Sequence, residues 1–196
     1  MSPDPGATTS SHPVFTWALG PGEESDSVHI ANQPDTTPDG EFHSENVVAI
    51  GNAEPDSTTW SPTDPLFAGR YWWNVETRDA DFAPSFSPVR DFTVATEIRL
   101  LSVRFARYTV GRHVRIDLRW VTNAHDVVVE VRFLRRGRTV GLVRRQGETL
   151  ISRDPDSAVL TWTAPRKVGR RSGLVAVVRV TGAGASATTR RSFTAP

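Results

Sequence analysis

Short runs of alternating hydrophobic and polar residues recur along the whole chain. The clearest run is 114–120 (VRIDLRW), in which apolar and charged side chains alternate without a break. A period of two is typical of a β-strand that buries one face and leaves the other in water. Because nowhere do ten or more residues repeat apolar positions at helical spacing, the pattern predicts an all-β fold.

Proline, glycine, aspartate and asparagine divide these runs into separate strands. In the first half the pattern predicts strands at 14–19, 27–31, 42–50, 57–60, 70–78 and 89–95, with a turn-rich loop at 32–40. In the second half it predicts strands at 99–105, 113–121, 127–134, 139–144, 158–163, 174–181 and 188–194. Gly137 is expected to take a positive φ in a tight hairpin. Seven strands in about 100 residues are typical of an immunoglobulin-like sandwich.

The charge of the chain changes sign at Thr96. Residues 1–96 carry 15 acidic side chains and three arginines, a formal charge of −12, whereas residues 97–196 carry 20 basic and seven acidic side chains, a charge of +13. The shift predicts two domains, an acidic 13–96 and a basic 97–196. The Pro/Ser/Thr-rich segment 1–12 is expected to be a flexible leader or a weak edge strand. Charge of this size governs association, which raises the hypothesis of an electrostatic contact between the domains or between copies.

Three motifs of the first half occur in the order expected for one known family. They are PVFTW at 13–17, LFAGRYWWNV at 66–75 and FSPVRDFTV at 86–94. With these motifs, residues 13–95 resemble a bacterial fibronectin type III domain. The resemblance implies a tyrosine corner, in which the phenol of Tyr71 bonds back to the backbone a few residues upstream and Leu66 packs beneath it. It also implies that Trp17 fills the core between the two sheets.

The second half resembles the bacterial Ig-like modules that are appended to surface proteins and hydrolases. The motifs that carry this resemblance are 127–133, RRGRTV at 135–140, LTW at 160–162 and TGAGA at 181–185. Together the two resemblances imply two tandem immunoglobulin-like β-sandwiches, the first of them fibronectin type III-like. They imply a spacer, adhesion or ligand-binding role outside the cell, although a fold alone does not assign one.

Trp72 and Asn74 are the candidate ligand-binding residues of the first half. Strand alternation sends Tyr71 and Trp73 inward and leaves Trp72, Asn74 and Glu76 on the outer face of a central strand. An outward tryptophan flanked by polar groups can stack on a sugar ring or accept a cation. The alternative is that Trp72 covers neighbouring strands or packs under an arginine stem.

Arg132 and Arg179 are the candidate binding residues of the second half. The strand pattern aligns them with Arg190 or Arg191 across one outer face. A second set of arginines aligns across the opposite face: Arg104, Arg115 and Arg119. The aromatic residues fall at inward positions: Phe105, Trp120, Phe133 and Trp162. Nucleic-acid binding usually interleaves charge with aromatics on one side, so the expected partner is an anionic cell-wall polymer or the acidic neighbour domain.

The sequence offers little for catalysis or for a metal. It has no cysteine, no G-x-S-x-G elbow and no glycine-rich phosphate loop, and its five histidines lack H-x-H or H-E-x-x-H spacing. The acidic loops around Asp35 and Asp79 lack the ladder of calcium ligands. We therefore expect no catalytic residue, no metal and no cofactor, and we expect that the protein is not an enzyme.

The location of the protein follows from its resemblance and from its hydropathy. No apolar run approaches the roughly 18 residues of a membrane span, and the first 13 residues lack a secretory signal. The chain is thus expected to be cytosolic or a fragment of a longer exported protein, and the resemblance favours a secreted or cell-surface place. The predicted function is a non-catalytic interaction or spacer protein that binds a protein or a glycan polymer. The alternatives are an accessory carbohydrate-binding module of a secreted hydrolase and a polyanion-binding module.

Overall fold

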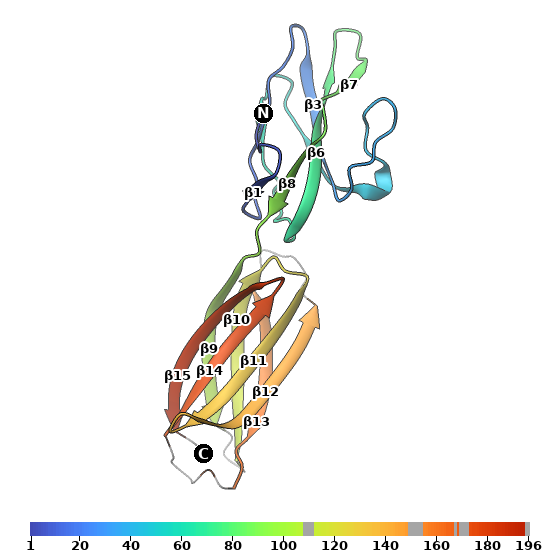
Figure 1. The fold of residues 1–196 in the computed structure, drawn as a ribbon. Coiled ribbons are helices and arrows are strands. Elements are labelled where there is room, and N and C mark those ends of the chain that lie inside the picture. The colour runs from blue at the N-terminus through green and yellow to red at the C-terminus, as the bar shows by residue number, and fades with distance from the viewer. Residues whose placement is uncertain (108–111, 149–154, 167, 169–172, 195–196) are drawn as a thin grey trace. The chain divides into compact units, whose positions relative to one another are not determined.

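The computed structural model describes residues 1–107, 112–148, 155–166, 168 and 173–194. The chain divides into two compact units, Met1–Ala95 and Thr96–Pro196 (Figure 1). Each unit is built from two β-sheets, which confirms the prediction of an all-β chain with immunoglobulin-like sandwiches. Among the described residues, no helix is long and apolar enough to cross a membrane.

The first unit has one large sheet and one small sheet. Its elements are β1 (Ala7–Thr9), β2 (Phe15–Thr16), β3 (Glu24–Ala31), the 3-10 turn η1 (Ser44–Asn46), β4 (Val47–Asn52), β5 (Thr59–Trp60), β6 (Gly69–Arg78), β7 (Pro84–Phe86) and β8 (Arg90–Val94). The large sheet has the order β1-β8-β6-β3-β4, with β7 also paired to β6, and β2 pairs with β5. Because β1 pairs in parallel with β8, part of segment 1–12 forms an edge strand.

Aromatic side chains fill the space between the sheets of the first unit. Phe15 on β2 packs edge-to-face against Trp73 and Phe92, with ring centroids 4.9 and 5.4 Å apart. Trp17 is buried in the same core, as the resemblance implied, and its indole N–H donates to Ser25 Oγ over 2.8 Å. Buried aromatics dominate the energetics of such a core because each removes 150–250 Å² from water.

The tyrosine corner is present. The phenol of Tyr71 donates to the backbone carbonyl of Phe67 over 3.0 Å, and Leu66 is buried in the same cluster. Burial raises the pKa of Tyr71 above its ordinary value of 10.0. The corner ties the start of β6 to the loop before it.

The strand boundaries of the first unit differ from the prediction in several places. The strands predicted at 14–19 and 57–60 are shorter, Phe15–Thr16 and Thr59–Trp60, and the strand predicted at 27–31 begins at Glu24. The strand predicted at 42–50 begins at Val47, because Phe42 is buried as the anchor of the preceding loop and bridges to Thr36. The strand predicted at 89–95 is β8, and the short strand β7 before it was missed. Pro88 cannot donate a ladder hydrogen bond, and the Ser87 hydroxyl accepts the Val75 N–H there instead.

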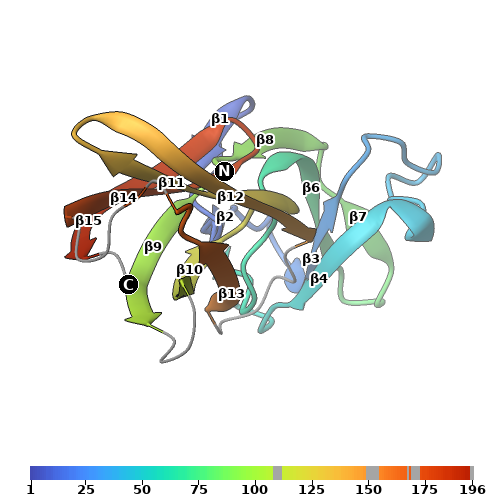
Figure 2. The ribbon, with the colours of Figure 1, turned by 90° about the horizontal axis from the view of Figure 1, so that it is seen from below.

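The second unit has seven long strands in two layers (Figures 1 and 2). They are β9 (Ile98–Arg107), β10 (His113–Thr122), β11 (Asp126–Arg135), β12 (Arg138–Glu148), β13 (Asp156–Thr163), β14 (Gly173–Gly182) and β15 (Ala185–Thr194). The sheet orders are β13-β10-β9 and β12-β11-β14-β15. Every predicted strand is present. At the β11–β12 hairpin, Arg136 and Gly137 take φ of 50° and 77°, which confirms the predicted turn.

Each unit packs a tryptophan of one sheet against a glycine of the other. In the first unit Trp60 of β5 lies where a side chain on Gly51 of β4 would stand, and in the second unit Trp162 of β13 does the same at Gly141 of β12. A Cβ at either glycine would overlap the indole. Trp162 also stacks on Phe133, with centroids 3.9 Å apart. The repeated pair shows that β4 and β12 hold equivalent positions.

Candidate functional site

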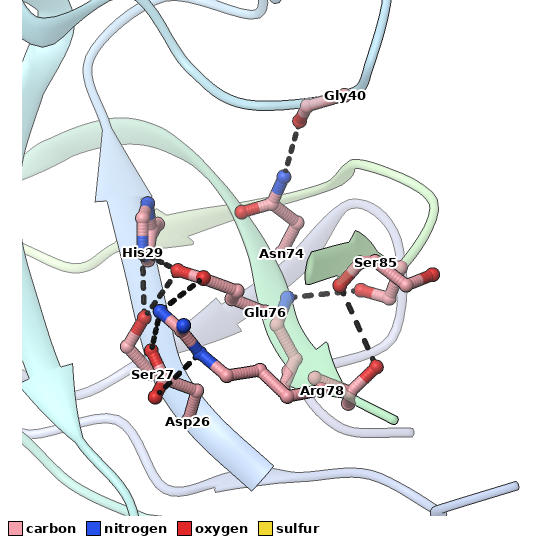
Figure 3. Close-up of polar contacts among 11 residues, drawn as sticks. Asp26, Ser27, His29, Gly40, Asn74, Glu76, Arg78 and Ser85 are labelled. Atoms are coloured by element: carbon pink, nitrogen blue, oxygen red, sulfur yellow. Dashed lines mark hydrogen bonds and ion pairs between the residues drawn. The ribbon is translucent and has the colours of Figure 1, made fainter. Parts of the chain in front are cut away.

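A polar cluster lies on the outer face of the first unit, between β3 and β6 (Figure 3). Val28 and Ile30 of β3 point into the core, so their neighbours Ser27 and His29 point outward. The strand register places Ser27 opposite Glu76 and His29 opposite Asn74. All four side chains are therefore brought together on one face.

Glu76 is the centre of this cluster. Its Oε2 accepts a hydrogen bond from Ser27 Oγ over 3.1 Å and lies 3.4 Å from His29 Nε2. Its Oε1 accepts from Arg78 over 3.1 Å, and Arg78 also pairs with Asp26 at 3.0 Å (Figure 3). The side chains of His29 and Glu76 are only 8% and 13% exposed, so these ion-assisted bonds form largely out of water.

The cluster contains serine, histidine and a carboxylate, but not in the geometry of a catalytic triad. In a triad, the nucleophile and the acid contact different nitrogens of the imidazole. Here Ser27 and Glu76 both meet Nε2, at 2.7 and 3.4 Å, while Nδ1 of His29 is buried and has no hydrogen-bond partner among the described residues. The arrangement fixes β3 to β6 and does not orient His29 as a base with a supporting acid.

Asn74 is on the outer face of β6, as predicted, but it is buried there and does not meet solvent. Its side chain does point outward, but the loop between β3 and β4 folds back over it. Its Nδ2 donates to the carbonyl of Gly40 over 2.8 Å, and the residue is fully buried (Figure 3). Asn74 therefore anchors the loop. The signal in the sequence was Phe42, an apolar residue that holds the returning end of this loop.

Trp72 is half-buried, and an arginine occupies one face of its ring. The guanidinium carbon of Arg70 lies 5.2 Å from the ring centroid, and Arg70 also pairs with Asp91 at 2.9 Å. The carboxylate holds the guanidinium in place, so the cation–π contact costs little extra ordering. Trp72 thus packs against an arginine through one face of its ring.

Four arginines converge on the outer face of the sheet β12-β11-β14-β15. Arg132 on β11 is in one row with Val177 on β14 and Arg190 on β15. In the next row, Arg144 on β12 and Arg179 on β14 flank Glu130 of β11. We call these four residues the basic face: Arg132, Arg144, Arg179 and Arg190. Arg191 points to the other side of the sheet, because it pairs with the buried Ala176.

The charges of the basic face are mostly open to solvent. Arg132 pairs with Glu130 at 2.9 Å, and Arg179 donates to the hydroxyl of Ser186 over 3.3 Å. Within the described part of the chain, the structure records an ion pair for no other member of the face. Arg144 was expected from the sequence in a basic turn with Arg145, but it lies within β12, two positions after the outward Leu142 and on the same face.

The opposite face of the second unit is also basic, as predicted. On β9 and β10, Arg104 lies opposite Asp117, and Arg115 and Arg119 flank that carboxylate. Arg115 is bound to Asp117 over 2.8 Å, so this face is partly neutralised. An open hollow of about 420 Å³ lies beside Arg104 and Arg119.

One carboxyl group stands apart at the end of β13. Asp156 pairs in register with Trp120 and, together with Arg145 of β12, lines a pocket of about 90 Å³. Burial raises the pKa of Asp156 above its ordinary value of 3.8. Among the described residues, no group of three or more histidines or carboxylates is placed to hold a metal ion.

No family model and no curated protein matches the chain. Among solved structures, it is similar to the chicken interferon gamma receptor alpha chain, with 10% identity, a TM-score of 0.41, and coverage of 98% of this chain and 96% of that one. It is similar to fibronectin(III)-like modules of Clostridium thermocellum CbhA, with 13% identity, a TM-score of 0.33 and coverage of 96% and 90%. It is also similar to latent PorU from Porphyromonas gingivalis, with 13% identity and a TM-score of 0.37. The match covers 97% of this chain but only 19% of that protein. Because these sequence identities and TM-scores are low, the fold assignment rests on the strand order of the two units.

Proposed function

We propose that this chain is a non-catalytic interaction unit outside the cell, secreted or at a cell surface, and that its second unit binds an anionic partner through the basic face. The observation that carries the proposal is that four arginines lie on one outer face of one sheet, two of them beside Glu130. Arginine suits carboxylate and phosphate groups because its planar fork donates several hydrogen bonds at once.

The arrangement favours an extended anion over a small one. The arginines stand on four neighbouring strands, and strands lie about 4.8 Å apart, so the basic face spans more than one anionic group. A polymer with repeated carboxylates, such as an acidic cell-wall glycan, presents charges at a comparable spacing. Single-stranded nucleic acid gains much of its affinity from stacking on exposed aromatics, whereas Trp120, Phe133 and Trp162 are buried here.

The test uses the full chain and two matched variants. In the first, Arg144→Gln, Arg179→Gln and Arg190→Gln remove three charges from the basic face. In the control, Arg104→Gln, Arg115→Gln and Arg119→Gln remove three charges from the opposite face. Binding to polygalacturonate is measured by titration calorimetry in 50 mM NaCl, where screening is weak.

We expect the first variant to lose at least about tenfold in affinity and the control to lose much less, because salt-dependent affinity follows the charges that touch the polymer. Equal losses in the two variants would mean that net charge alone attracts the polymer. Absence of binding by the unaltered chain would remove the proposed function.

A further inference from the structure

Both units leave the same edge strand without a strand partner. β4 ends the sheet β1-β8-β6-β3-β4, and β12 ends the sheet β12-β11-β14-β15. The two strands hold equivalent positions, as the pairs of Gly51 with Trp60 and of Gly141 with Trp162 show. Among the described residues, no further strand pairs with the free side of either. Each edge therefore presents a row of backbone donors and acceptors.

The edge of the acidic unit lacks the usual protection. Native edge strands are commonly blocked by charged side chains, by proline or by being very short. β4 has six residues, VVAIGN, with neither charge nor proline. Two of its large apolar side chains are open to solvent, Val48 at 44% and Ile50 at 58% exposure. Such a strand is a template for the addition of another strand.

The edge of the basic unit offers a complementary strand. Leu142 lies on the outward face of β12 and is 54% exposed. The charged residues nearest to it along β12 are basic and exposed: Arg138, Arg144 and Arg145. β4 is flanked instead by exposed carboxylates, Glu45 before it and Glu54 after it. Each edge strand thus has an exposed apolar residue at its centre, and the charges near the two strands are of opposite sign.

We propose that β4 of one copy of this chain pairs antiparallel with β12 of a second copy, with Ile50 opposite Leu142. In an unbroken register this places both apolar side chains on the outer face of a continuous sheet. The same register sets Glu54 opposite Arg138. A parallel alignment with the same centre would set Glu54 opposite Gln146 and lose that ion pair.

Charge selects this pairing over the symmetric ones. Two β4 edges would bring together two units of charge −12, counted from 15 acidic and three basic residues each, and two β12 edges would bring together two units of +13, from 20 basic and seven acidic. Like charges across an interface are strongly disfavoured. Pairing of β4 with β12 is heterologous, so each copy keeps one free edge and the assembly grows head to tail. This inference goes beyond the proposed function, because it needs no anionic polymer.

The test is sedimentation velocity of the full chain from 1 to 200 μM in 50 mM NaCl. Ile50→Lys disables the β4 edge, Leu142→Glu disables the β12 edge, and Val14→Lys is the control at an equally exposed valine (56%) outside both strands. We expect the unaltered chain and Val14→Lys to form concentration-dependent assemblies, and each edge variant alone to sediment as a monomer. Circular dichroism checks that the variants remain folded.

A mixture of the two edge variants separates this pairing from all others. The Ile50→Lys copy keeps an intact β12 and the Leu142→Glu copy keeps an intact β4, so an equimolar mixture should form dimers and nothing larger. A monomeric wild-type chain at 200 μM would overturn the proposal. So would assembly of Leu142→Glu alone, which would indicate pairing of β4 with β4, or a mixture that stays monomeric.

Discussion

In the first unit, arginines and carboxylates meet each other, whereas in the second unit most arginines of the basic face point to water. Arg78 bonds Glu76 and Asp26, and Arg70 bonds Asp91. On the basic face, Arg132 is paired, and the structure records no ion pair for Arg144 or Arg190 in the described part of the chain. The two units share a sandwich plan and even a glycine–tryptophan pair, so the fold does not dictate this difference.

The difference arises from what covers each sheet. In the first unit, the loop between β3 and β4 returns over the sheet and its Gly40 carbonyl accepts from Asn74, so the polar residues beneath it must satisfy each other. In the second unit, a two-residue turn at Arg136 and Gly137 joins β11 to β12 and covers nothing. The length of one connection thus decides whether an outer face is internal structure or a surface for partners.

The largest expected effect comes from the core of the first unit, at two adjacent tryptophans. Trp73→Ala removes a fully buried ring and should lower the free energy of unfolding by about 3–5 kcal/mol. Trp72→Ala, on the outer face, should cost about 1 kcal/mol, the size of an exposed cation–π contact. Urea unfolding monitored by far-UV circular dichroism measures both. Equal losses would mean that the strand does not have one core face and one outer face.

Next in size is the carboxylate that holds the polar cluster. Glu76→Ala removes the carboxylate that accepts from the Ser27 hydroxyl and from Arg78, and it should cost about 2–3 kcal/mol, since the group is largely out of water. Asp117→Ala in the second unit breaks the more exposed pair with Arg115 and should cost under about 1 kcal/mol. The same urea titration compares them, and a larger loss from Asp117→Ala would refute the contrast between the units.

The glycine–tryptophan pairs should respond alike in both units. Gly51→Ala and Gly141→Ala each place a Cβ inside an indole, and overpacking of this kind should cost about 1–3 kcal/mol. Gly147→Ala is the control, because nothing lies within 4 Å of its added carbon, and it should be neutral or slightly stabilising. Thermal unfolding by calorimetry measures all three. If Gly141→Ala lowered the thermal stability and Gly51→Ala did not, the result would contradict the structural equivalence of β4 and β12.

The tyrosine corner should contribute a modest and pH-dependent stabilisation. Tyr71→Phe removes one neutral hydrogen bond and should cost about 1 kcal/mol at neutral pH. Because the folded pKa of Tyr71 is raised above 10.0, the unfolded chain ionises first, so the wild-type protein loses stability as the pH rises through 10. The variant lacks this loss. The difference in urea midpoint between the wild-type protein and Tyr71→Phe should therefore be smaller at pH 10.5 than at pH 7. An equal difference at the two pH values would contradict the burial of the phenol.

The smallest effect is expected at Asp156, where burial works against the charged form. Its raised folded pKa means that ionisation costs stability at neutral pH and that the cost disappears as the pH falls below 3.8. Asp156→Asn should therefore unfold at a slightly higher urea concentration than wild type at pH 7 and at the same concentration at pH 3. A destabilised variant at pH 7 would show that the carboxylate has a stabilising partner.

Strict alternation of apolar and polar residues made the strands of the second unit predictable. The first unit lacks this regularity, so its strands were harder to predict. Residues 114–120 alternate without a break, and the seven strands were predicted with small errors at their ends. In the first unit, the short strand β7 before Pro88 was missed, and Asn74 was placed on an open face because only Phe42 marks the return of residues 32–46 over it. The cluster around Glu76 was missed for the same reason. Arg132 and Arg179 were placed on one face correctly, because the face on which a side chain of a long strand lies follows from alternation.

The central claim is that Arg144, Arg179 and Arg190 of the basic face bind an anionic partner. The most direct test is the salt dependence of polygalacturonate binding by the full chain, with and without Arg144→Gln, Arg179→Gln and Arg190→Gln. If these three side chains touch the polymer, the slope of log K against log salt should become shallower by about 2 in the variant. An unchanged slope would mean that the polymer binds elsewhere, and it would contradict the claim.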